Sequence, residues 1–192
     1  MRKLLVVIAA IALLLAVYVG SIVVSVRGLI DAARSGNSAE LLARTDLPRL
    51  RRSISAQILD VYLEKNAGNR KPLERMLVNT YGASVADAML AKFLTPEVLT
   101  RLLQTGSVTD TSRNTVWEIP PVDSIDTSKL FDLVGRLRPI QIKTIEIRTS
   151  ASDAPELYSA VSLSLDGTTW KLSGLRMPKA LAEKLAQSLP GR

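Results

Sequence analysis

The N-terminal apolar run constrains this chain more than any other feature. Arg2 and Lys3 precede an uncharged stretch from Leu4 to Val26. A helix that crosses a bilayer needs about 20 mostly apolar residues, so the stretch is long enough to span one. A signal peptide has an apolar core of about 7 to 15 residues and ends at a small-x-small site. Residues 19–21 match such a site poorly, so we expect an uncleaved signal-anchor over 1–26, with secretion after signal cleavage as the alternative.

The charges around this segment give two opposing indications of its orientation. Arg2 and Lys3 favour a cytoplasmic N-terminus, because loops rich in Lys and Arg stay on the cytoplasmic side. Arg27, Arg34 and Arg44 follow the segment and oppose that orientation. We expect the N-terminus inside and the rest of the chain across the membrane.

The composition argues against several classes of function. The sequence has neither Cys nor His, so thiol chemistry is excluded and a zinc site would need carboxylates alone. Lys and Arg number 25 against 18 Asp and Glu, and aromatic residues make up only 4%. A nucleic-acid surface needs clustered charge, usually with stacking aromatics. No G-x-S-x-G elbow or phosphate-binding loop occurs. We therefore expect no enzyme, no catalytic residue, no metal, no cofactor and no nucleic-acid partner.

The residues after the apolar run have a helical pattern. From Ile22 to Ala33 apolar residues recur every three or four positions, which predicts one buried helix face. The stretch 35–38 ends that helix, and Asn37 or Ser38 caps a short helix over 39–44. Asp46 is the expected N-cap of the next helix.

The stretch "DLPRLRRSISAQIL", residues 46–59, is an amphipathic helix with Arg49, Arg51 and Arg52 off its apolar face. One interpretation is a solvated face. The other is a basic surface that contacts the membrane or an acidic partner. Together with Gln57, these arginines are the candidate surface or binding residues.

Two of these four residues also have structural explanations. Arg51 could pair with Glu40 or Asp46, and Gln57 could donate to a loop carbonyl. The choice between binding and structure stays open at this point.

Further helices are predicted over 73–81, 85–93 and 96–105. In the last of these Thr95 caps, Pro96 takes the first turn and Gly106 ends the helix. Residues 107–136 are read as an exposed loop or partner-binding arm, with a short helix over 129–137.

The C-terminal part alternates with period two, which is typical of strands. Ile140 and Ile142 share one parity and Ile145 and Ile147 the other, so a bulge is predicted at 143–144. The run 161–172 predicts two strands joined by a hairpin turn at 166–167, with the register breaking near Gly174. A helix over 179–189 follows.

These elements predict an α+β fold: an N-terminal transmembrane helix, then several helices packed on a curved, cone-like antiparallel sheet. We expect a single domain over 27–192, helical over 27–106 and mainly strands over 139–178. Trp170 is expected on the apolar side of the sheet.

Two stretches, "LIDAARSGNSAELLARTDLPRLRRSISAQI" and "LDGTTWKLSGLRMP", resemble a bacterial domain-of-unknown-function family of short membrane-anchored proteins. Its D-[FL]-P-x-[LV]-R-x-[SA]-[LI]-x-x-Q pattern corresponds here to 46–57. The strand half is also similar to nuclear-transport-factor-two-like cone domains. The resemblance implies an envelope protein of a Gram-negative bacterium and implies no activity. It places the chain in the inner membrane as a single-pass protein with a periplasmic domain.

Two functions remain open from the sequence. The first is a non-catalytic binding or accessory module that holds an apolar or lipid-like ligand in the cone. The second is a structural or interaction module that binds another envelope protein. An apolar cavity inside the cone would favour the first, and an exposed apolar patch would favour the second.

Overall fold

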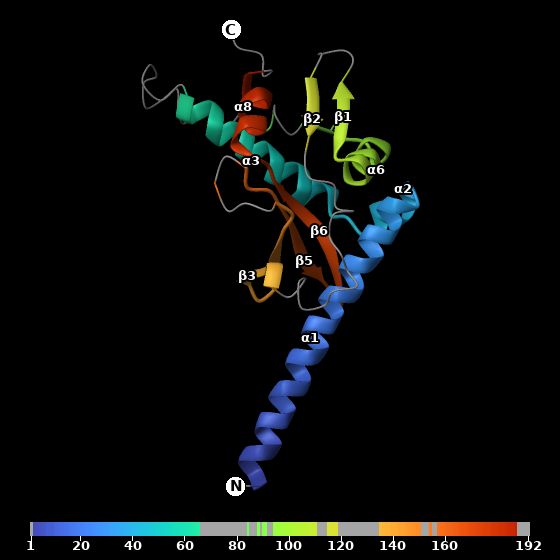
Figure 1. The fold of residues 1–192 in the computed structure, drawn as a ribbon, viewed down its shortest axis with the longest axis vertical. Helices are drawn as coiled ribbons and strands as arrows, with labels where there is room; N and C mark the ends of the chain where they lie inside the picture. Colours follow the sequence, from blue (N-terminus) through green and yellow to red (C-terminus); the bar gives the residue numbers. More distant parts are fainter. Residues whose placement is uncertain are drawn as a thin grey trace.

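The computed structural model describes residues 2–65, 84, 88, 90–91, 94–110, 115–118, 135–150, 154 and 157–187. Over these residues the chain has an α+β fold, in which one long helix extends from a head of shorter helices and a four-stranded antiparallel sheet (Figure 1). The predicted fold class is therefore confirmed. The helices expected over 73–81 and 85–93 fall largely outside the described residues.

The described helices begin and end where the local capping chemistry predicts. Asn37 accepts a hydrogen bond from the Glu40 backbone N–H, and Thr95 accepts one from that of Val98 at 3.3 Å. Gly106 ends its helix with a φ of +72°, a backbone conformation that glycine adopts at little cost. The helices are α1 (Arg2–Arg34), α2 (Ser38–Ala43), α3 (Leu47–Lys65), α6 (Pro96–Thr105) and α8 (Lys179–Gln187).

The main sheet is an antiparallel meander in the order β3-β4-β5-β6, and a separate hairpin pairs β1 with β2. Thr45 extends the sheet past β6, because the Leu172 backbone N–H donates to the carbonyl of Arg44 at 2.9 Å. The strands are β1 (Ser107–Asp110), β2 (Thr115–Glu118), β3 (Leu137–Gln141), β4 (Thr144–Arg148), β5 (Ala160–Asp166) and β6 (Thr169–Arg176).

The structure corrects two expectations about the strand half. The first part of the stretch read as a loop or arm forms the β1–β2 hairpin. The bulge predicted at 143–144 is wrong: residues 142–143 are a tight turn that joins β3 to β4. The isoleucines change parity because the chain reverses there, and a turn without Gly, Pro, Asn or Asp gave no sequence signal.

The second hairpin agrees more closely with the sequence. Its turn is centred on residues 167–168, one position later than predicted. The register shifts where Ser162 faces Gly174 and Leu163 faces Leu172, which confirms a break near Gly174. A Cβ on Gly174 would lie 3.0 Å from the Ser53 Oγ, so this glycine lets α3 pack closely on β6.

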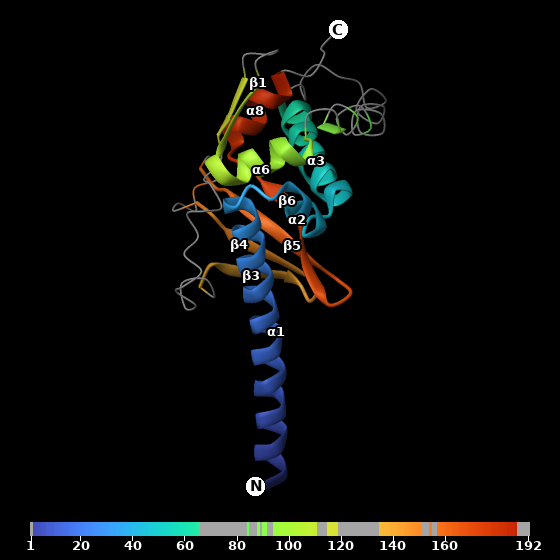
Figure 2. The same cartoon turned by 90° about the vertical axis from the view of Figure 1, so that its right-hand side faces the viewer.

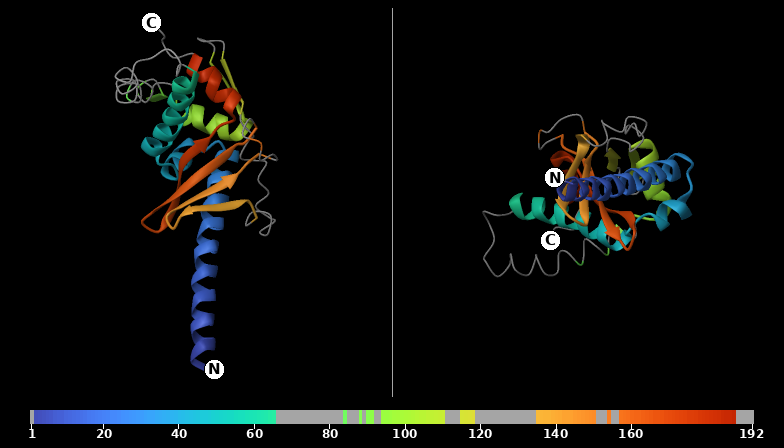
Figure 3. Two further views of the ribbon diagram at one scale, coloured as in Figure 1. Left: turned by 90° about the vertical axis from the view of Figure 1, so that its left-hand side faces the viewer. Right: turned by 90° about the horizontal axis from the view of Figure 1, so that it is seen from below.

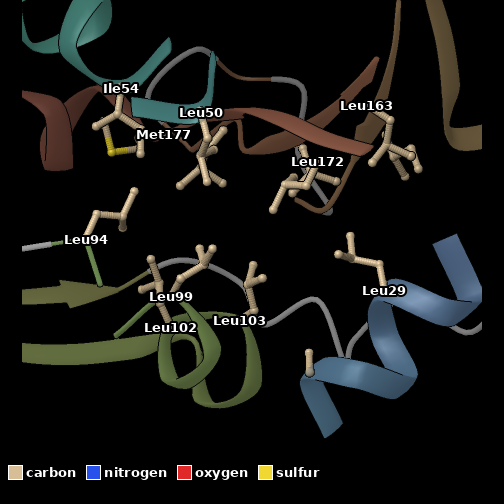
Figure 4. Close-up of a cluster of buried hydrophobic side chains, with 14 of the residues drawn as sticks. Leu29, Leu50, Ile54, Leu94, Leu99, Leu102, Leu103, Leu163, Leu172 and Met177 are labelled. Carbon is tan, nitrogen blue, oxygen red and sulfur yellow. The ribbon is translucent and has the colours of Figure 1, made fainter. Parts of the chain in front are cut away.

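One buried cluster joins the helices to the sheet (Figure 4). Leu29 enters it from α1, Leu50 and Ile54 from α3, and Leu172 from β6. Trp170 is only 2% exposed, as the sequence predicts. Further members include Ile22, Val26, Ile30, Leu41, Leu94, Leu99, Leu102, Leu103, Ile145, Ile147, Val161, Leu163, Met177, Leu181 and Leu185.

The long helix α1 has two different surroundings along its length. Its N-terminal half extends away from the head, while its C-terminal half lies against the sheet (Figures 2 and 3). Only 6% of its most apolar 18-residue window is buried, and it is long and apolar enough to cross a membrane. The helix runs through residue 26 without a break, so the apolar segment and the first helix of the head form one rod.

Candidate functional site

The four residues singled out from the sequence do not converge on one site. Arg49 and Arg52 are exposed on α3. Arg49 is already engaged: its Nη1 donates to the Ser164 Oγ at 3.0 Å, and its Nε lies 3.2 Å from a carboxylate oxygen of Asp46. A binding role for the exposed arginines stays a prediction.

Arg51 lies half-buried against the helical side of the head. Its Nη2 is 3.5 Å from the Leu94 carbonyl oxygen, and among the described residues its buried Nε has no hydrogen-bond partner. The expected ion pair is wrong, because Glu40 pairs with Arg44 at 3.0 Å and Asp46 pairs with Arg49. The α-helical spacings i,i+4 and i,i+3 favour those local partners over Arg51.

Gln57 connects α3 to the end of β6. Its Nε2 donates to the carbonyl oxygen of Leu175, and its Oε1 accepts from the backbone N–H of Met177 at 2.9 Å. The amide satisfies a backbone carbonyl, as expected, but that carbonyl belongs to strand β6 and not to a loop. The side chain binds two backbone groups at the end of β6, which is a structural role.

A polar cluster that the sequence did not reveal connects β4 and β6 to Tyr158 in the β4–β5 connection. The Tyr158 hydroxyl donates to Glu146 at 2.5 Å, and the Arg176 Nε lies 3.5 Å from the same carboxylate. The guanidinium groups of Arg138 and Arg176 lie 5.9 and 5.8 Å from the centre of the Tyr158 ring. Burial raises the pKa of Tyr158, and its hydrogen bond to Glu146 raises it further. Tyr158 and Arg176 both contact the Glu146 carboxylate, so the cluster connects β4 to β6 and to the chain that precedes β5.

Metal binding has no visible basis over the described part of the chain. No three side chains among Asp, Glu, His and Cys gather there in a way that could hold an ion.

A concave surface lies at the lower end of the head, where α1 passes the β3–β4 turn. It is an open groove of about 710 Å³, and among its lining side chains only Gln141 is neither aliphatic nor aromatic. We call it the α1–turn groove. Its lining is Ile11, Leu14, Leu15 and Tyr18 from α1, and Ile140, Gln141 and Ile142 from the turn region.

Tyr18 connects this groove to the core. Its hydroxyl donates to the Ile142 carbonyl at 2.9 Å, and its ring meets the Trp170 ring edge-on, with the centroids 5.5 Å apart. The Trp170 Nε1 in turn donates to the Ser21 Oγ at 3.0 Å. Tyr18 therefore fixes the β3–β4 turn beside α1 while covering the largest buried side chain of the sheet.

Sequence reasoning missed this groove because it depends on contacts between residues more than 120 positions apart. Two signals were present. Tyr18 is the only aromatic residue in the N-terminal apolar run, and "IQIK" places two isoleucines around one polar residue. Neither signal identifies the other as its partner.

Comparison with known proteins supports a likeness over the helical half. The model of a family described as "Protein of unknown function (DUF2939)" matches residues 11–102. The first quoted stretch, residues 29–58, lies inside this match, and the second, residues 165–178, lies outside it. No curated protein and no solved structure matches the chain. From the apolar helix to α6, the chain is thus similar to a family of proteins of unknown function.

Proposed function

We propose that the chain is a single-pass membrane protein of the bacterial envelope, a non-catalytic module that holds an apolar or lipid-like chain in the α1–turn groove. The observation that carries the proposal is the position of the groove. One wall is the helix that is apolar enough to cross a membrane, and the other is the exposed apolar β3–β4 turn. The proposed binding site therefore differs from the one expected from the sequence. It lies at the end of the head next to the apolar helix, and not in the interior of a cone.

The contacts of α1 favour an uncleaved anchor. Cleavage near residues 19–21 would remove Tyr18, expose one edge of Trp170 and leave the Ile142 carbonyl without its donor. A signal peptide is discarded from the mature protein, so such contacts with the folded head would be lost. The mature protein is expected to retain its N-terminal residues, which intact-mass measurement would test.

The proposed location is the inner membrane of a Gram-negative bacterium, with Arg2 and Lys3 in the cytoplasm and the head in the periplasm. The basic N-terminus supports this orientation through the positive-inside rule. Periplasmic activity of an alkaline phosphatase fused after residue 187 would support it.

The proposal that the module is not an enzyme rests on the lack of reactive side chains in the lining of the groove. Apart from the Tyr18 hydroxyl and the Gln141 amide, the lining offers no group that could act as an acid, base or nucleophile. The absence of His and Cys from the sequence points the same way.

A pair of matched variants tests the ligand. Leu14 and its neighbour Leu13 are similarly exposed, at 70% and 66%, but only Leu14 lines the groove. Leu14→Trp should fill the groove and reduce the lipid that the detergent-purified protein retains in native mass spectrometry. Leu13→Trp adds the same side chain to the same helix and should leave retention unchanged. Equal retention by both variants would contradict the proposal.

One observation favours the second function that the sequence left open. The β3–β4 turn forms an exposed apolar patch, the feature expected of an interaction module. In that case the patch would bind another envelope protein, and filling the groove would leave lipid retention unaltered.

A further inference from the structure

The β3–β4 turn exposes more apolar surface than is usual for a turn that faces water. Ile142 is 86% exposed and Ile140 is 53% exposed, and Lys143 beside them is also exposed. Turns in water favour small and polar residues, so two exposed isoleucines at this position need an apolar neighbour.

The position of the turn along α1 indicates that this apolar neighbour is the hydrocarbon layer of the bilayer. Leu4 follows the two N-terminal cations, and Tyr18 lies 14 residues further along the helix. At a rise of 1.5 Å per residue this separation is about 21 Å, whereas the hydrocarbon layer of a bilayer is about 30 Å thick. If Leu4 marks one boundary of that layer, Tyr18 and the turn bonded to it lie inside the opposite boundary.

The outward face of α1 supports the same depth. Val17, just before Tyr18, is 64% exposed and Val24, beyond it, is 70% exposed, and the next charged residue after Tyr18 is Arg27. Leu4 to Val24 spans about 30 Å, which matches the hydrocarbon thickness. If this whole face lies in lipid, the lower end of the head must lie in the bilayer as well, because it packs on the opposite face of the same stretch of helix.

The backbone of the turn is suited to such an environment. Within hydrocarbon every peptide group needs a partner from the protein. The Ile142 carbonyl accepts from the Tyr18 hydroxyl at 2.9 Å, and the Lys143 carbonyl accepts from the Leu165 backbone N–H at 2.9 Å. Both turn carbonyls are therefore satisfied without water, and the Lys143 side chain is long enough to reach the headgroups.

We propose that the β3–β4 turn is inserted into the bilayer beside α1, and that acyl chains of the surrounding membrane lipids fill the α1–turn groove. This inference rests on the proposed membrane anchor and names the source of the apolar chain. The head then contacts the membrane at two places, through the helix and through Ile140 and Ile142.

Depth-dependent fluorescence quenching tests the insertion. Because the chain has no cysteine, single variants of the full-length protein each carry one environment-sensitive label. The labelled positions are Ile142→Cys in the turn, Leu13→Cys on the anchor, and Leu157→Cys. Leu157 is a matched control, since it is 63% exposed and lies in the β4–β5 connection at the other end of the strands. The proteins are reconstituted into phosphatidylcholine vesicles that contain spin-labelled acyl chains.

The expected result is quenching at position 142 about as strong as at position 13 and several-fold stronger than at position 157. Quenching at 13 with none at 142 would overturn the insertion and leave the anchor intact. No quenching at 13 would overturn both the anchor and the insertion. Equal quenching at 142 and 157 would overturn the special role of the turn. Circular dichroism of each labelled variant verifies that the head is folded.

Discussion

The two halves of α1 differ in composition and in surroundings. Leu4 to Val17 is apolar throughout, whereas Ile22 to Ala33 also contains Ser25, Arg27, Gly28 and Asp31. From Leu4 to Val17 large apolar side chains are exposed around the helix, whereas from Ile22 to Ala33 a single face is buried in the head. A helix that is apolar on all sides suits lipid, and a helix with one apolar stripe suits a protein core. The comparison teaches that the spacing of apolar residues marks where the helix changes from exposed on all sides to buried on one face.

The change occurs over one helical turn. Tyr18 and Ser21 are the polar-tipped residues at that level, and both use their hydroxyl groups on partners in or beside the sheet. The junction is therefore built from side-chain hydrogen bonds and one aromatic contact, with no interruption of the helix.

The largest expected effect is at this junction. Trp170→Ala should destabilise the fold by about 3–5 kcal/mol, because it leaves a large cavity at a fully buried position. Chemical unfolding of the detergent-solubilised chain measures the loss. Tyr18→Phe keeps the ring contact and removes only the hydroxyl, so it should cost about 1 kcal/mol. A near-neutral Trp170→Ala would mean that the sheet does not depend on α1 at this level.

A pair of identical substitutions tests the two halves directly. Leu29 is 2% exposed in the upper half and Leu13 is 66% exposed in the lower half. Leu29→Ala should cost about 2–5 kcal/mol of unfolding free energy through the cavity that it creates. Leu13→Ala should change that free energy by less than about 0.5 kcal/mol, since the side chain is mostly exposed. Similar losses for both would remove the distinction between the halves.

The smallest effect is expected at the exposed arginines of α3, which sharpens the contrast with the buried face of α1. Arg49→Glu combined with Arg52→Glu should leave the fold intact and cost about 1 kcal/mol or less, because both residues are exposed. Thermal unfolding of the double variant measures this. A loss of several kcal/mol would show that the Arg49 contacts to Asp46 and Ser164 carry far more stability than exposed contacts normally do.

Much of the fold could be predicted because its signals are local. The N-caps at Asn37, Asp46 and Thr95 and the αL glycine at 106 depend on residues within one helical turn of one another. The apolar period that begins at Ile22 likewise predicted the buried face of α1.

The rest could not be predicted because it depends on distant pairings. The turn at 142–143 has no residue that favours reversal, so its isoleucines suggested one bulged strand where there are two strands. The Glu146–Tyr158–Arg176 cluster and the α1–turn groove form only once the strands are placed in order. The candidate arginines were visible as a pattern in the sequence, but their ion-pair partners were not. Helix geometry favours Arg44 as the partner of Glu40 and Arg49 as the partner of Asp46, so neither carboxylate pairs with Arg51.

The absence of a break in α1 has a mechanical consequence. Where an anchor and a domain are joined by a flexible linker, the domain samples many heights and directions. If α1 is the membrane anchor that we propose, a rotation or tilt of the helix is transmitted directly to the four-stranded sheet. The head would then stay in a thin layer next to the membrane, and any molecule that it binds would have to reach that layer.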